Sequence, residues 1–197
     1  VLMLLAEKDI PLKEKLVNII PELKYEDKRV EDITIKSLLN HTSGLPDVKN
    51  YNWKNSHESA SSLKEYVLGM KLKVNAQPGT KFYYSNLGYN ILGIVVDKLS
   101  DISFEDYVKQ NILNSAEMHS SDFRYFKIPD SIKTSPHSKR LITKNVFALE
   151  NYPYTREQAP SSTLNSSASD LSKWMIFFLK GLESDKTESH FSIMIEP

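Results

Sequence analysis

The apolar segment at residues 87–99 constrains the fold of this chain more than any other part of the sequence. Its apolar side chains recur at the spacing of an α-helix and predict a helix that packs in the core. Gly88 and Gly93 interrupt this segment at a cost in helix propensity. We therefore expect both glycines to allow another backbone to approach the helix closely.

Two shorter helices are predicted before this segment. Thr34 has the character of a helix cap, and Gly44 is expected to end the helix that runs from Thr34 to His41. Apolar residues at residues 63–70 recur three, four and seven positions apart, which predicts a second amphipathic helix. The side chains expected to face the core are Ile35, Leu38 and Leu39 in the first helix and Leu63, Tyr66, Val67 and Met70 in the second.

Two more helices are predicted after the central one, each beginning at a serine. Ser103 and Ser167 are each followed three positions later by an aspartate, a pattern that resembles a capping box. Gly181 is expected to end the second of these helices. The side chains expected to face the core are Phe104, Tyr107, Val108 and Ile112 in the first and Leu171, Trp174 and Phe178 in the second.

Strand patterns are few, so the sequence predicts a mainly α chain with irregular loops. Residues 123–158 are rich in Pro, Ser and Lys with isolated aromatic residues, and we expect loops there with one short hairpin. A length of 197 residues allows one domain with a substantial core, or a large part of one domain.

The composition narrows the classes of function. Lys plus Arg and Asp plus Glu both number 25, so no net charge draws the chain to nucleic acid or to an anionic membrane. Cysteine is absent and the five histidines are scattered, so we expect no disulfide, no metal site and no cofactor. No apolar run has the length of a membrane-spanning helix.

The start of the central helix carries the sequence most suggestive of chemistry. A Pro-Gly turn at residues 78–79 leads into an aromatic extended stretch and then into Tyr84, Ser85 and Asn86. The free backbone N–H groups and the dipole at a helix N-terminus favour a developing negative charge. A phenol and an amide at such a position suit proton transfer and the orientation of a carbonyl group. The alternative is structural, with Ser85 or Asn86 capping the helix and Tyr84 packing its ring.

Four segments in a fixed order resemble the β-lactamase-related serine hydrolases, the family of class C β-lactamases, DD-peptidases and their esterase relatives. The segments are residues 33–46, 84–100, 159–167 and 170–174. The resemblance implies one domain over residues 1–197, truncated at both ends. Within it, residues 1–122 are the best-matching helical part, 123–160 are variable loops, and 161–182 are a stretch bordering the pocket and a helix. The implied fold is the helical region of the β-lactamase/transpeptidase-like α+β fold, with most of the sheet missing at both ends.

The resemblance also implies covalent serine catalysis. In this family a Ser-x-x-Lys serine attacks the carbonyl, and its lysine and a tyrosine share the proton transfers. By the same resemblance Tyr84 is the catalytic tyrosine, Asn86 orients the substrate, and Ser85 is the middle residue of the motif and a second candidate for substrate binding. A phenol beside a lysine ammonium has a lowered pKa and can act as a base near neutral pH.

The nucleophile itself is expected outside this chain. The family order places Ser-x-x-Lys before Val1 and the closing strand motif beyond Pro197, so we expect a fragment with weak or no turnover. The run Ser-Ser-Leu-Lys at residues 61–64 matches Ser-x-x-Lys, but it follows the His-Thr-Ser-Gly segment that the family's nucleophile precedes. An ordinary cap at Ser61 and a solvated Lys64 explain it better.

Two other segments have competing interpretations. His41 lies two residues from Ser43, but neighbours in a turn rarely face each other as base and nucleophile, which favours a structural role in capping and loop closure. Residues 159–165 either border the pocket or form a plain turn before the next helix.

The expected function is therefore part of a serine acyl-transfer hydrolase. Its partner would be a small molecule or peptide with an ester or amide carbonyl, and the resemblance implies the cell envelope or secretion. The alternatives are a non-catalytic relative that binds peptide or cell-wall ligands, and a purely structural helical module.

Overall fold

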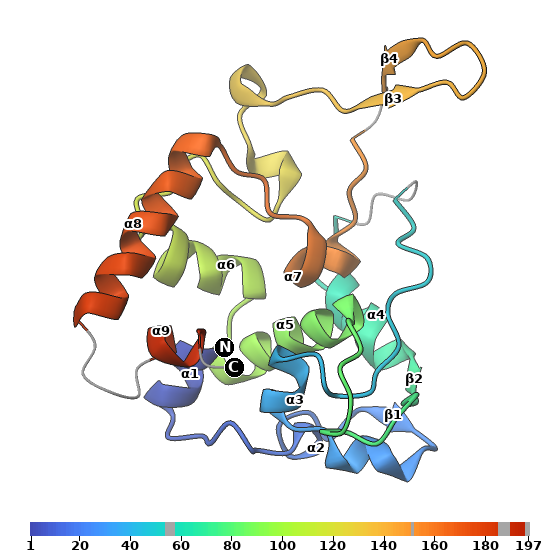
Figure 1. Cartoon of the computed structure of the whole chain (residues 1–197), viewed down its shortest axis with the longest axis vertical. Helices are drawn as coiled ribbons and strands as arrows, with labels where there is room; N and C mark the ends of the chain where they lie inside the picture. The colour runs from blue at the N-terminus through green and yellow to red at the C-terminus, as the bar shows by residue number, and fades with distance from the viewer. Residues whose placement is uncertain (54–57, 151, 185–189, 196–197) are drawn as a thin grey trace.

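The computed structural model describes residues 1–53, 58–150, 152–184 and 190–195. Most of the described regular structure is helical, as predicted (Figure 1). The helices are α1 (Leu2–Glu7), α2 (Leu16–Ile19), α3 (Ile35–Leu39), α4 (Ser62–Gly69), α5 (Asn86–Ser100), α6 (Phe104–Val108), α7 (Ala159–Ser162), α8 (Ala168–Ser184) and α9 (His190–Ile193). Shorter turns of 3₁₀ or π type are Lys28–Asp32, Lys109–Leu113, Tyr125–Lys127, Asp130–Ile132 and Arg156–Gln158.

Two small sheets accompany the helices. Strands β1 (Lys24–Tyr25) and β2 (Lys71–Leu72) pair in parallel, with Tyr25 opposite Leu72. Strands β3 (His137–Lys139) and β4 (Val146–Ala148) form an antiparallel hairpin that projects away from the helices (Figure 1). The hairpin confirms the one predicted within residues 123–158.

Helix α5 is the centre of the molecule and contacts α1, α3, α4, α6 and α7 (Figure 1). Its buried apolar side chains join those of α1, α3 and α4 in one core, which confirms the prediction of a core helix. The buried apolar residues of α5 are Leu87, Ile91, Leu92, Ile94, Val95 and Val96.

The prediction that both glycines of α5 admit another backbone is wrong in its detail. A Cβ on Gly93 would lie 2.2 Å from Cγ of Pro160, so this glycine admits the proline ring of α7. A Cβ on Gly88 would meet Leu38 only at an ordinary contact distance of 3.5 Å. Close packing therefore requires a glycine at position 93 and not at position 88.

Helix α3 begins as predicted and ends earlier. Thr34 Oγ1 accepts a hydrogen bond from the Ser37 backbone N–H, which completes a capping box. The helix ends at Leu39, and His41 follows it in the left-handed conformation with φ of 58°, ahead of Gly44, which is also left-handed with φ of 73°. Gly44 instead lies against the next layer of chain, where a Cβ would be 2.3 Å from the carbonyl oxygen of Ala76.

Helix α8 also departs from its prediction. Ser167 Oγ accepts a hydrogen bond from the Asp170 N–H, so the predicted cap is confirmed. Gly181 does not end the helix; it lies inside α8, where a Cβ would come within 2.6 Å of the Phe191 ring. Leu171 was expected to face the core, but it is 50% exposed.

In the part of the chain that the structure describes, none of the helices has both the length and the apolar character needed to span a bilayer.

Candidate active site

Backbone hydrogen bonds place the segment that leads to Tyr84 beside the end of α3. The turn at residues 78–80 forms as predicted, with Gly79 in the left-handed conformation at φ of 83°. The Gly79 N–H donates to the Thr42 carbonyl at 2.8 Å, and the Tyr83 N–H donates to the His41 carbonyl at 2.7 Å. The chain therefore enters α5 from a fixed position next to His41.

Ser85 is the N-cap of α5. Its hydroxyl accepts from the Gly88 N–H at 3.1 Å and donates to the Pro46 carbonyl at 2.8 Å, and the residue is 1% exposed. Burial and these two bonds favour a role in positioning the helix start over the substrate contact that we expected for Ser85.

Replacing Ser85 with alanine should destabilise the chain by about 1–2 kcal/mol, because it removes a helix cap and the hydrogen bond to the partly buried Pro46 carbonyl. The matched control is Ser61→Ala. Ser61 is the N-cap residue of α4, but it makes no side-chain cap bond there, contrary to our expectation of an ordinary cap. Urea unfolding of both variants measures the difference, and equal losses would show that the Ser85 cap has no special weight.

Asn86 is the first residue of α5, and its side chain is held at both ends. Its Nδ2 donates to the Tyr51 hydroxyl at 2.5 Å, and its Oδ1 accepts from the Tyr84 hydroxyl at 3.1 Å. Its backbone N–H donates to Asp47 Oδ1 at 2.7 Å, which places a carboxylate at the positive end of the helix dipole. The Tyr51 ring stacks on Trp53 at a centroid distance of 5.1 Å.

Tyr84 extends from this helix start to the surface and is 56% exposed. Its ring centroid lies 4.5 Å from that of His41, and its hydroxyl bonds to Asn86. The phenol and the amide that the sequence singled out are therefore joined by a direct hydrogen bond.

His41 is the residue of this site that sequence reasoning did not connect to the motif. Its Nδ1 accepts from the Ser85 backbone N–H at 3.1 Å, across a separation of 44 positions. Burial lowers the pKa of the His41 imidazole, and the Asp47 carboxylate acts in the opposite direction. The only signal in the sequence was the His-Thr-Ser-Gly segment itself, which carries no information about what the ring contacts.

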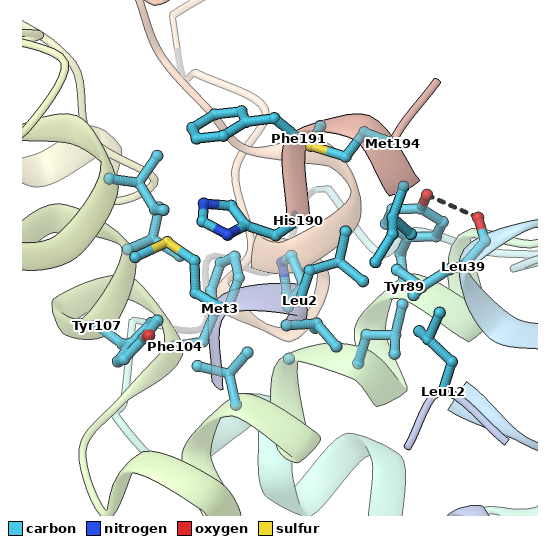
Figure 2. A pocket seen from close by; sticks show the side chains of 18 of the residues that line it. Leu2, Met3, Leu12, Leu39, Tyr89, Phe104, Tyr107, His190, Phe191 and Met194 are labelled. Atoms are coloured by element: carbon cyan, nitrogen blue, oxygen red, sulfur yellow. Dashed lines mark hydrogen bonds between the residues drawn. The ribbon is translucent and has the colours of Figure 1, made fainter. Parts of the chain in front are cut away.

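A large apolar cavity lies elsewhere. It measures about 620 Å³ and is lined mainly by apolar side chains of α1, α5, α6, α8 and α9 (Figure 2). Tyr89 reaches its edge and donates a hydrogen bond to the Leu39 carbonyl (Figure 2). Neither this cavity nor a second one of about 170 Å³ near Tyr125 includes Tyr84 in its lining.

The other candidate segments have structural contacts. Lys64 is exposed while Ser62 is buried, and Ser61 pairs with Ser59 at 2.9 Å between hydroxyl oxygens. Residues 159–162 form α7, and Asn165 pairs with Asp122 through two backbone hydrogen bonds. Among residues 1–53, 58–150, 152–184 and 190–195, no group of histidine and acidic side chains could hold a metal ion.

Known proteins are similar to this chain in sequence. The family model described as Beta-lactamase matches residues 1–192. Penicillin-binding protein 4* of Bacillus subtilis (strain 168) is 33% identical over 124 residues, covering 60% of this chain and 26% of that protein. Protein flp of Staphylococcus aureus (strain MW2) is 27% identical over 186 residues, covering 91% of this chain and 36% of that protein. The chain thus spans about a quarter to a third of the length of these relatives.

Solved structures share the fold. The octameric penicillin-binding protein homologue from Pyrococcus abyssi aligns with a TM-score of 0.71 at 21% identity, covering 98% of this chain and 44% of that one. D-amino acid amidase from Ochrobactrum anthropi aligns with a TM-score of 0.72 at 19% identity, covering 94% and 54%. A class C beta lactamase aligns with a TM-score of 0.63 at 20% identity, covering 88% and 45%. With its family model matched over residues 1–192, the chain belongs to the beta-lactamase family.

Proposed function

We propose that this chain carries the tyrosine side of the active site of a serine acyl-transfer hydrolase. Tyr84 is the proton-transfer residue, and Asn86 orients the substrate carbonyl. The observation that supports this most is the hydrogen bond from the exposed Tyr84 hydroxyl to Asn86 Oδ1 at the start of α5, in a chain of this family.

The chemistry suits these two groups. As the nucleophilic serine oxygen bonds to the carbonyl carbon, its proton passes to the hydroxyl oxygen of Tyr84, and the proton that this hydroxyl carried passes to the leaving group as its bond to the carbonyl carbon breaks. In the resting chain the phenol is held by Asn86, which keeps its oxygen close to the amide that would orient the carbonyl. The serine and its lysine are supplied, in this proposal, by sequence that precedes Val1.

The proposed substrate is a small molecule or peptide with an ester or amide carbonyl. One structural neighbour is named a D-amino acid amidase and another a class C beta lactamase, and an amide and a β-lactam share the acyl carbonyl that a serine nucleophile would attack. Residues 1–197 alone are expected to show weak or no turnover, because the nucleophile lies outside them.

Covalent labelling of the full-length protein tests the proposal. A fluorescent penicillin should form an adduct that survives denaturing electrophoresis, and D-phenylalanine amide or a chromogenic β-lactam should compete for it. Mass spectrometry would then place the adduct on a serine. Saturable binding of the penicillin without any covalent adduct would contradict the proposal and favour the non-catalytic relative.

A further inference from the structure

The hydrogen bond at His41 fixes the protonation state of the ring. A backbone N–H can only donate, so Nδ1 of His41 must carry a lone pair to accept from Ser85. The neutral imidazole then has its proton on Nε2. An imidazolium would place a second donor against the Ser85 N–H and break the bond.

The same ring contacts the rings of two tyrosines. Its centroid is 4.5 Å from Tyr84 and 5.1 Å from Tyr89, whose ring is nearly parallel to it at 28°. Tyr89 is anchored from α5 to the end of α3 by the hydrogen bond to the Leu39 carbonyl (Figure 2). The exposed Tyr84 ring is thus supported by His41, which is itself supported by an anchored ring.

The backbone holds His41 in this place. Its φ of 58° lies in the left-handed region, which costs a histidine free energy that a glycine or asparagine avoids in large part. The Thr42 N–H donates to the Ser37 carbonyl, and the His41 carbonyl accepts from Tyr83. Both flanking bonds fix the direction in which the ring leaves the chain.

Resting on the proposed role of Tyr84, we infer that His41 is a positioning residue for that tyrosine. Its neutral ring sets the start of α5 through Ser85 and supports the Tyr84 ring, and protonation of Nδ1 breaks the bond to Ser85 that holds the imidazole in this position. His41 touches neither the substrate nor the reacting atoms in this arrangement; it acts through Tyr84.

The surroundings determine the direction of the pH effect. Burial lowers the pKa of His41, the Asp47 carboxylate opposes this, and the rings of Tyr84 and Tyr89 flank the imidazole. The folded chain therefore holds the neutral ring. The stability that this contact gives is complete above the ordinary histidine pKa of 6.5, and it is lost as the pH falls through the lowered value.

Two substitutions separate the hydrogen bond from the titration, and both residues suit the left-handed backbone. His41→Asn keeps an acceptor, since Oδ1 of asparagine branches at the same point as Nδ1, but it cannot titrate. His41→Gly removes the acceptor and the ring. Circular dichroism melts would first establish that both variants fold.

The first measurement uses nuclear magnetic resonance and needs no turnover. In the wild type, the amide resonance of Ser85 and the ring resonances of Tyr84 should shift with one midpoint below pH 6.5, the same as that of the His41 ring. Both pH-dependent shifts should vanish in His41→Asn. A Ser85 amide that ignores the titration of His41, or a His41 ring with its neutral proton on Nδ1, would overturn the inference.

The second measurement follows acylation of the full-length protein. At neutral pH His41→Gly should lower the acylation rate by up to about a hundredfold, and His41→Asn should restore the part of that loss that comes from the hydrogen bond to Ser85. As the pH falls through the lowered pKa of His41, the acylation rate of the wild type should drop, and this drop should be absent in His41→Asn. Equal rates for the glycine variant and the wild type would overturn the inference.

The two proposals fail in different ways. If Tyr84→Phe acylates like the wild type while the Ser85 amide still follows the His41 titration, the proposed function fails and the contact stands. If acylation requires Tyr84 but is indifferent to His41, the proposed function stands and the positioning role fails.

Discussion

Replacing Tyr84 with phenylalanine is expected to slow acylation of the full-length protein by about 10²–10⁴-fold, the range that general acid–base groups contribute. The substitution removes only the hydroxyl that donates to Asn86, and the ring can keep its contact with His41. Because Tyr84 is largely exposed, the free energy of unfolding should hardly change. Stopped-flow labelling with a fluorescent penicillin gives the acylation rate, and urea unfolding gives the stability.

Tyr83→Phe is the matched control. Tyr83 precedes Tyr84 directly, it is also exposed, and it has no proposed role in the chemistry. This variant should acylate at the wild-type rate. Equal rates for both variants would remove Tyr84 from the mechanism, and equal losses in both would indicate a general disturbance of the segment.

Arg156→Met should destabilise the chain by about 3–5 kcal/mol, the usual cost of leaving one charge of a buried ion pair without its partner. Nε of Arg156 donates to Glu105 Oε1 at 2.5 Å and Nη2 donates to Oε2 at 3.2 Å, and both residues are buried. Nη1 of Arg156 also donates to the Glu58 carbonyl. Arg156, in the segment before α7, thereby joins Glu105 of α6 to Glu58 in the segment before α4. Urea unfolding measures the loss.

Two further variants test whether the loss of stability in Arg156→Met comes from a buried charge left without its partner. The double variant Glu105→Leu with Arg156→Met should recover much of the lost stability, because no unpaired charge remains buried. Lys71→Met breaks the ion pair with Glu26, whose side chains are 70% and 80% exposed, and it should change stability little. If Arg156→Met were as mild as Lys71→Met, burial would not govern the strength of these pairs.

Features decided within a few residues were predictable. The cap at Thr34 was predicted from its residue type, and those at Ser103 and Ser167 from their spacing to an aspartate. All three are present, because each depends on a side chain and an N–H three positions away. The start of α5 at Ser85 and Asn86 was predictable for the same reason.

Features decided by distant segments were not predictable. Gly44 and Gly181 were taken for helix ends, but Gly44 has a left-handed φ of 73° and lies against Ala76, and Gly181 lies against the Phe191 ring. No local pattern encodes which segment will pack there. The contact between His41 and Ser85 was missed for the same reason, since it depends on how α3 and α5 cross.

The close contact between Gly44 and Ala76 limits which substitutions this part of the molecule can accept. At Gly44 the backbone of the loop after α3 lies so close to the backbone at Ala76 that a side chain has no room between them. The distance between these two segments is therefore set by direct backbone contact. The Asn75 N–H bonds to the Gly44 carbonyl and secures that spacing. Substituting an exposed side chain such as that of Lys81 should therefore leave this spacing unchanged, whereas a side chain at position 44 should push the two segments apart.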